Sequence, residues 1–303
     1  MRQARSILSG LRLPEADAHD LPGSAKRFAD GGQYRIEIPS VEGPRALEAV
    51  VAAAAEHAVG VHRISQGSGI MLLTDAEISA MLALGRAQGI EVCLFVGPRA
   101  SWDVGVQAAS PNGRVLGASL RGADQLAYGI EDVLRASALG VRSVLVGDVG
   151  HLMVLGRMKA KGDLPSDFVL KTSITLPAAN PATARVLEDL GATSVNLPVD
   201  LSLAQIAAVR QAIDVAIDFY VESPDDFGGA VRHYEIPELV RVAAPIYLKF
   251  GLRNAPGLYP SGQHLEAAVL ALSRERVRRA AIGLGILRRY APGAVASPMG
   301  PTR

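Results

Sequence analysis

Charged and polar side chains alternate with apolar ones in three short stretches, and this alternation is the main chemical signal in the sequence. The stretch DVAIDFYVE ends at Glu222, and the stretches FVLKTSIT and PIYLKFG alternate in the same way around Lys171 and Lys249. In a β-strand, successive side chains point to opposite faces, so the polar ones share one face. Burial lowers the pKa of Lys and raises that of a carboxyl group, which suits acid–base chemistry near pH 7. We therefore predict as catalytic residues Lys171, Asp218, Tyr220, Glu222 and Lys249.

A second set of polar residues lies within or directly after other predicted strands. Glycine-rich loops such as QGSG let backbone N–H groups approach an anion, and arginine can donate two hydrogen bonds to a carboxylate or phosphate. These features favour a small anionic or polar substrate. The predicted substrate-binding residues are Glu37, Arg63, Gln66, Arg99, Asn196 and Arg253.

The same charges admit other roles. In one alternative they pair only with each other, for example Lys249 with Asp218 and Lys171 with Glu222, in a buried structural network. A lysine could instead form a Schiff base in a lyase, and Glu37, Asp218 and Glu222 could hold a divalent metal. No cofactor is predicted, and a divalent metal remains an open alternative.

Eight strand candidates alternate with helical patterns and position these residues. Alternating strands and helices favour a parallel sheet, and eight such units in about 250 residues predict a closed (β/α)8 TIM-like barrel. An open doubly wound sheet is the alternative, but no Gly-x-Gly-x-x-Gly turn joins a strand to a helix. The candidate strands are Tyr34–Pro39, Gly60–Ser65, Ile90–Gly97, Val141–Asp148, Phe168–Thr175, Ala192–Pro198, Asp214–Glu222 and Pro245–Gly251.

The barrel domain is predicted to span residues 33–290, between a loose leader at 1–32 and a flexible tail at 291–303. Residues 99–122 exceed an ordinary connection between a strand and a helix. They contain the turn signal Pro-Asn-Gly. We therefore expect a hairpin insertion after the third strand that covers the barrel mouth as a lid.

Composition narrows the class of protein. The chain has 303 residues, a net charge of +1, 49% apolar and 20% charged residues, which indicates a globular protein and argues against nucleic-acid or membrane-surface binding. The amino-terminus lacks the apolar core of a signal peptide, so we expect a cytoplasmic protein. Only 5 of the 31 basic residues are lysines, and alanine is abundant, which suggests a GC-rich bacterial genome. The arginine-rich helix at 265–290 fits a solvated or homo-oligomeric face better than an RNA-binding one.

The order of residues from 140 to 222 resembles the U32 peptidase (collagenase-like protease) family. The stretches that carry the resemblance are GVRSVLVGDVGHLMVLGRM and LKTSITLPAANPATARVLEDLGATSVNLPVDLSLAQI. Downstream, IPELVRVAAPIYLKFGLR resembles the final strand of that family, with a Leu-Lys-x-x-x-Arg pattern on Lys249 and Arg253. The family's acidic residue in this pattern is replaced here by Gly251.

The resemblance implies a TIM-like barrel and two kinds of activity. Some relatives are described as peptidases, and others hydroxylate RNA bases or quinone precursors with a four-cysteine iron–sulfur cluster. This chain has a single cysteine, Cys93, and reads ESPDDFGGAVRHYE where the family has a cysteine-containing segment. We therefore expect a divergent member without an iron–sulfur cluster, most simply a hydrolase or lyase. A peptidase or peptide-binding protein, and a non-catalytic partner subunit with a structural charged core, are the alternatives.

Overall fold

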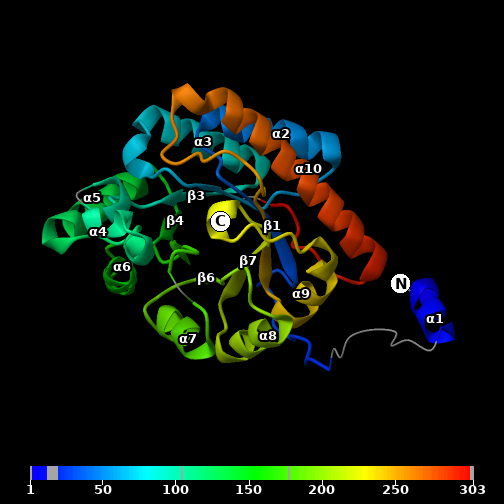
Figure 1. The fold of residues 1–303 in the computed structure, drawn as a ribbon. Coiled ribbons are helices and arrows are strands. Elements are labelled where there is room, and N and C mark those ends of the chain that lie inside the picture. Colours follow the sequence, from blue (N-terminus) through cyan, green and yellow to red (C-terminus); the bar gives the residue numbers. More distant parts are fainter. Residues whose placement is uncertain (1, 12–19, 104, 177, 301–303) are drawn as a thin grey trace.

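Eight parallel strands close into a barrel in which each strand pairs with its neighbours in sequence and β8 pairs with β1 (Figure 1). The computed structural model describes residues 2–11, 20–103, 105–176 and 178–300. The predicted (β/α)8 barrel is confirmed, and each strand falls within its predicted segment to within one residue. The strands are β1 (Tyr34–Pro39), β2 (Arg63–Gln66), β3 (Glu91–Phe95), β4 (Ser143–Val146), β5 (Val169–Thr172), β6 (Ser194–Asn196), β7 (Ala216–Glu222) and β8 (Ile246–Phe250).

Helices cover the outside of the barrel, and local sequence signals fix where several of them begin. Thr74 and Ser202 each form a capping box with the residue three positions later, and Asn180 accepts a hydrogen bond from the N–H of Thr183. Such caps satisfy N–H groups that have no partner within the helix. The outer helices are α2 (Pro44–His57), α3 (Asp75–Gln88), α5 (Gly122–Ala138), α6 (Val149–Lys161), α7 (Pro181–Asp189), α8 (Leu203–Ala212), α9 (Ile236–Ala243) and α10 (Glu266–Tyr290).

The hydrophobic core is a shell between the strands and the helices. Outward side chains of the strands, such as Ile36, Ile38, Leu170 and Ile217, are at most 1% exposed and belong to one continuous apolar cluster. The alternation predicted from the sequence therefore holds for these strands. The inward side chains of the same strands are largely polar, and they fill the lumen.

The insertion after β3 is present but is not a hairpin. It forms the 3-10 turn Ala100–Trp102, the short helix α4 (Val106–Ala109) and the 3-10 helix Pro111–Leu116. Ser110 accepts a hydrogen bond from the N–H of Gly113, and a proline follows the cap. A capping serine before proline starts a helical turn, and the alanines on either side favour helix over strand. The Pro-Asn-Gly segment therefore begins a helical turn and is not the turn between two strands that the sequence predicts.

Both terminal segments differ from simple loose ends. The leader contains the helix α1 (Arg2–Gly10), which stands apart from the barrel in Figure 1. Ser24 and Lys26 are bound to the barrel, through hydrogen bonds to the carbonyls of Ala244 and Ile213. Residues 1 and 12–19 of the predicted leader, and 301–303 of the predicted tail, lie outside the described residues.

The tail predicted as flexible is joined to β1 over its described part. Ala296 forms a parallel bridge with Tyr34, and the N–H of Ser297 donates to the carbonyl of Tyr34 at 3.0 Å. The hydroxyl of Ser297 also donates to Asp30. These contacts hold residues 296–300 across the amino-terminal end of the barrel.

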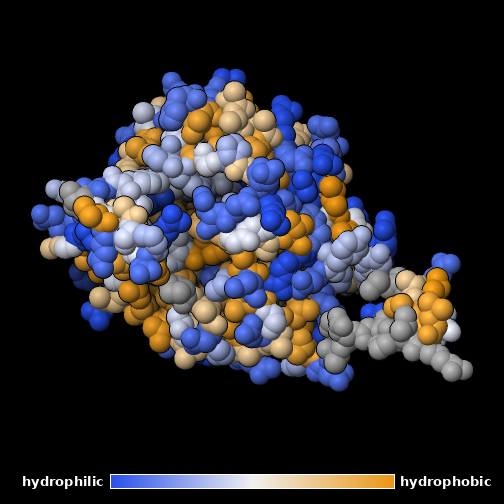
Figure 2. Space-filling view, in the orientation of Figure 1, coloured by the Kyte–Doolittle hydropathy of each residue, from blue (hydrophilic) through white to orange (hydrophobic). Residues whose placement is uncertain are grey.

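The surface carries apolar residues scattered among polar ones over the barrel, and an apolar stripe on α1 (Figure 2). Ile7 and Leu11 are 58% and 66% exposed. Among the helices of the described residues, none has the length and apolar character needed to cross a membrane.

Candidate functional site

Four charged residues from four strands meet inside the barrel. Lys171 on β5 forms an ion pair with Glu37 on β1, and its Nζ lies 3.6 Å from Oδ1 of Asp218 on β7. Arg63 on β2 donates to the same Oδ1 at 2.9 Å and lies 3.4 Å from Oε2 of Glu37. All four side chains are at most 2% exposed. Two cations and two carboxylates thus form a closed network at the centre of the lumen.

Lys249 on β8 lies at the edge of this network. Its Nζ is 3.7 Å from Oε1 of Glu37 and 4.0 Å from the centre of the Tyr220 ring, a cation–π contact. When the amide oxygen of Asn196 faces it, that oxygen accepts a hydrogen bond from Nζ at 2.8 Å. Lys249 therefore has no carboxylate within hydrogen-bond distance, unlike Lys171.

The two central carboxylates have opposite pKa shifts. Burial alone would raise the pKa of Glu37, but the charges of Lys171, Lys249 and Arg63 outweigh it and hold this pKa well below its usual range. Burial also raises the pKa of Asp218, and there the opposing cations do not fully compensate. Asp218 Oδ2 is buried without a hydrogen-bond partner. Pairs of carboxyl groups whose pKa values diverge are typical of acid–base sites.

Glu222 does not join the lumen, which corrects the prediction. The pairing of β7 with β8 shifts between Tyr220 and Glu222, so that Glu222 lies opposite the outward Phe250. A bulge adds one residue to a strand and turns the following side chain to the other face. Glu222 instead lies 3.1 Å from Nε2 of His233 and accepts a hydrogen bond from the N–H of Arg253.

This displacement separates the carboxylates suggested as metal ligands. Glu37 and Asp218 are both engaged by Lys171, whereas Glu222 contacts His233 outside the lumen. Within the described ranges, no group of three or more His, Cys, Asp or Glu residues is arranged to hold a metal ion. The salt bridges expected between Lys249 and Asp218 and between Lys171 and Glu222 are likewise replaced by pairs centred on Glu37.

Two of the predicted substrate-binding residues, Arg99 and Gln66, fix a loop at the carboxyl-terminal mouth of the barrel. The Arg99 guanidinium lies between the rings of Phe95 and Trp102, 3.6 and 4.0 Å from their centres, and donates to the carbonyl of Gly67. Gln66 bonds both the N–H and the carbonyl of Gly69. Arg253, in contrast, is 61% exposed and lies 3.6 Å from Asp225. Arg99 and Gln66 therefore position the loop, and Arg253 lies on the surface.

The segment after β8 covers this mouth. The Tyr259 hydroxyl lies 2.5 Å from Oγ of Ser40, and the N–H of Ser261 donates to Oγ of Ser68 at 2.7 Å. Glu42 accepts hydrogen bonds from the N–H groups of Gly67 and Ser68. Residues 251–265 thus join the loops after β1 and β2 and close the lumen above Lys249 and Tyr220.

Two further residues of the lumen were missing from the predicted site. Glu91 on β3 accepts a hydrogen bond from Nε of Arg63 at 2.8 Å, and the ring of Tyr247 lies 3.6 Å from the Arg63 guanidinium carbon. The alternation EVCLF puts Glu91 on the same face as Cys93 and Phe95, so the signal for it was present in the sequence.

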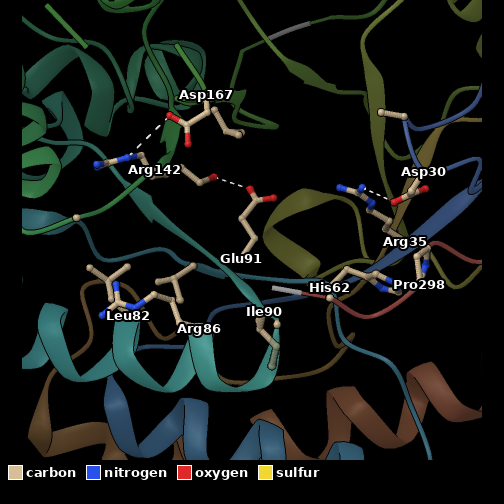
Figure 3. Close-up of a pocket in the computed structure, with 17 residues that line it drawn as sticks. Asp30, Arg35, His62, Leu82, Arg86, Ile90, Glu91, Arg142, Asp167 and Pro298 are labelled. Atoms are coloured by element: carbon tan, nitrogen blue, oxygen red, sulfur yellow. Dashed lines mark hydrogen bonds and ion pairs between the residues drawn. The ribbon is translucent and has the colours of Figure 1, made fainter. Parts of the chain in front are cut away.

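A separate cavity lies at the other, amino-terminal end of the barrel. It has a volume of about 800 Å³ and is lined by the starts of β3, β4 and β5 (Figure 3). Active sites of TIM barrels lie at the carboxyl-terminal face. Because the orphan oxygen of Asp218 and the loosely paired Lys249 belong to the lumen, we place the candidate active site there and treat the cavity separately.

Comparisons with known proteins give one family match and several similar solved structures. The family model for peptidase family U32 matches residues 119–223. Similar solved structures include a U32 peptidase, with 16% identity over 69% of this chain and 73% of the other and a TM-score of 0.41. CutC from Streptococcus agalactiae, described as a candidate copper homeostasis protein, has 14% identity, coverage of 71% and 98%, and a TM-score of 0.47. Oxaloacetate acetylhydrolase bound to oxalate has 14% identity, coverage of 89% and 86%, and a TM-score of 0.46.

A comparison with curated proteins finds no match. The family match covers about a third of the chain, from the end of the insertion to the end of β7. It contains Lys171, Asn196, Asp218 and Tyr220, and Lys249 lies beyond it. The resemblance to the U32 peptidases is thereby confirmed over residues 119–223, which match the model of peptidase family U32.

Proposed function

We propose that this protein is a U32-like barrel enzyme that acts on a small anionic or polar substrate through lysine and carboxylate acid–base chemistry. The observation that carries the proposal is the unequal pairing inside the lumen. Asp218 has a buried oxygen without a partner, and Lys249 has no carboxylate within hydrogen-bond distance. Buried polar atoms are nearly always bonded, so such an exception suggests a place for a ligand or a water molecule.

The proposed roles follow from position and charge. Lys249, at the edge of the network beside Tyr220, binds the anionic group of the substrate. Asp218, whose pKa is raised by burial, accepts or donates a proton, while Glu37 stays ionised and holds Lys171. Residues 251–265 must move for a substrate to reach Lys249, because that lysine is 2% exposed.

The proposal is tested by the small molecules that purify with the protein. Native wild-type protein and the Lys249→Met variant are denatured, and the released compounds are compared by mass spectrometry. We expect an anionic compound from the wild type that is at least about tenfold depleted in Lys249→Met, a loss of about 1.4 kcal/mol of binding free energy. Exposed Arg274 on α10 supplies a matched control, since Arg274→Met also removes one cation.

A non-catalytic subunit is the second candidate, and the balance of charges favours it. Three cations, Arg63, Lys171 and Lys249, face the three carboxylates Glu37, Glu91 and Asp218. If the lumen is only structural, Lys249→Met should cost about 3–5 kcal/mol of unfolding free energy, and wild type and variant should release the same compounds. A variant that keeps the stability of the wild type but loses the compound supports the enzyme.

A further inference from the structure

The cavity at the amino-terminal end of the barrel has the size and the lining of a binding site. Its volume of about 800 Å³ falls in the range of small-molecule pockets. Its walls come from α3, from the first residues of β3, β4 and β5, and from the tail at Pro298 and Gly300. This cavity is separate from the carboxyl-terminal mouth, so a ligand could bind there whether or not the lumen has the proposed activity.

Two guanidinium groups gather at one side of this cavity. Among the described residues, Arg86 has no hydrogen-bond or ion-pair partner, and its Nη1 lies 3.9 Å from where a Cβ on Gly140 would be. Arg142 lies two residues after Gly140. It donates hydrogen bonds to the carbonyls of Ser137 and Val141, and its Nε lies 3.9 Å from Oδ1 of Asp167. These two cations have few nearby carboxylates to balance their charge, which favours binding of an oxyanion between them.

A carboxylate reaches into the same cavity from the lumen. Glu91 keeps 16% of its side chain exposed, whereas Glu37 and Asp218 are fully buried. Its Oε1 accepts hydrogen bonds from Arg63 and Ser143, but Oε2 has only the Tyr247 hydroxyl, at 3.5 Å. Oε2 therefore has room for a further donor.

The close-up shows how these groups face the cavity. In Figure 3 Glu91 projects into the centre, with Arg142 and Arg86 on one side and the Asp30–Arg35 pair on the other. Asp30 and Arg35 bond each other at 2.8 Å and are satisfied. The groups left for a ligand are thus two guanidiniums, Oε2 of Glu91 and the carboxylate of Asp167, which lies 3.9 Å from Arg142.

We propose that this cavity binds a small molecule that carries both an oxyanion and an ammonium group. The oxyanion lies between Arg86 and Arg142, and the ammonium group donates to Oε2 of Glu91. A carboxylate and a phosphate share the chemistry of the first contact, so the two are separated by experiment. The probes are β-alanine and O-phosphoethanolamine, which join an amine to each kind of oxyanion through two carbons.

Isothermal titration calorimetry of the full chain tests the proposal. We expect saturable binding of at least one probe, and the tighter probe identifies the oxyanion. Arg86→Ala should weaken binding by at least about tenfold, because it removes a charge-assisted hydrogen bond. Arg274→Ala, which removes an exposed arginine of α10 without a described partner, should leave binding unchanged.

Glu91→Gln examines the other end of the ligand. The amide keeps the size of the side chain but removes its charge, so the preference for O-phosphoethanolamine over inorganic phosphate, or for β-alanine over propionate, should fall. Circular dichroism verifies that the variant is folded. Absence of saturable binding of both probes below about 10 mM, or equal binding by wild type and Arg86→Ala, overturns the proposal.

Discussion

The lumen of the barrel and the shell around it are both buried, but they are held together in different ways. The shell is apolar and continuous, with side chains such as Ile38, Phe168 and Val195 fully buried. The lumen instead contains ion pairs among Glu37, Lys171 and their neighbours. Apolar burial stabilises in proportion to area and is insensitive to pH, whereas a buried ion pair depends on both partners being present and charged. The two regions should therefore respond differently to the same size of perturbation.

The largest effect is expected from breaking the lumen network. Lys171→Met removes one of the two cations that Glu37 and Asp218 share, leaving Arg63 as the other, and should cost about 3–5 kcal/mol of unfolding free energy. Urea denaturation measures this cost. Adding Glu37→Gln to Lys171→Met removes one uncompensated charge and should recover part of the loss. If the double variant is less stable than Lys171→Met, the network does not act through charge.

His151 is a polar residue buried in the otherwise apolar surroundings of the barrel, and it gives the next largest expected effect. His151 on α6 is 1% exposed, and its Nε2 has no hydrogen-bond partner. Burial lowers its pKa from 6.5 to about 4, so it stays neutral in the folded protein while the unfolded chain takes up a proton. Stability from this residue is complete above pH 6.5 and falls as the pH drops toward 4, by about 3 kcal/mol in all.

Urea denaturation at pH 7 and pH 4.5 checks this expectation, with His151→Gln as the comparison. The wild type should lose more stability than the variant over this interval, since only the wild type has the histidine to titrate. Equal losses in both proteins would show that His151 is protonated in the folded state or is not buried.

The smallest effect is expected from a conservative change in the shell. Ile38→Val removes one methylene from a fully buried side chain of β1 and should cost about 1 kcal/mol. Its cost should be the same at pH 5 and pH 8, because no charge is involved. A cost that varies with pH would mean that the shell and the lumen are coupled through β1, whose neighbouring inward residue is Glu37.

The sequence predicted the shell better than the lumen, for a physical reason. Short apolar or alternating runs located all eight strands, and alternation assigned the outward side chains of β1, β5, β6, β7 and β8, because one face of each strand must meet the helices. The bulge after Tyr220 adds one residue without changing the alternation that precedes it, so the position of Glu222 could not be derived. Partners such as Lys171 and Glu37 are 134 residues apart, and only closure of the barrel brings them together.

The structure of the loops was also predicted poorly from the sequence. Pro-Asn-Gly fits a β-turn and a capped helical turn equally well, and the insertion adopts the second. Arg99 and Gln66 are predicted to bind substrate from their types and their places in loops after strands, whereas aromatic rings and backbone groups nearby occupy them. Residue type indicates what chemistry a group can do, and only the contacts show whether the group is free.

The bridge between Tyr34 and Ala296 has a consequence for how the chain is made. β1 is translated early, yet its neighbours at this edge, β8 and the tail, come more than 200 residues later. Until they emerge from the ribosome, β1 remains an unpaired strand edge able to pair with other chains. The nascent protein is therefore exposed to aggregation for most of its synthesis.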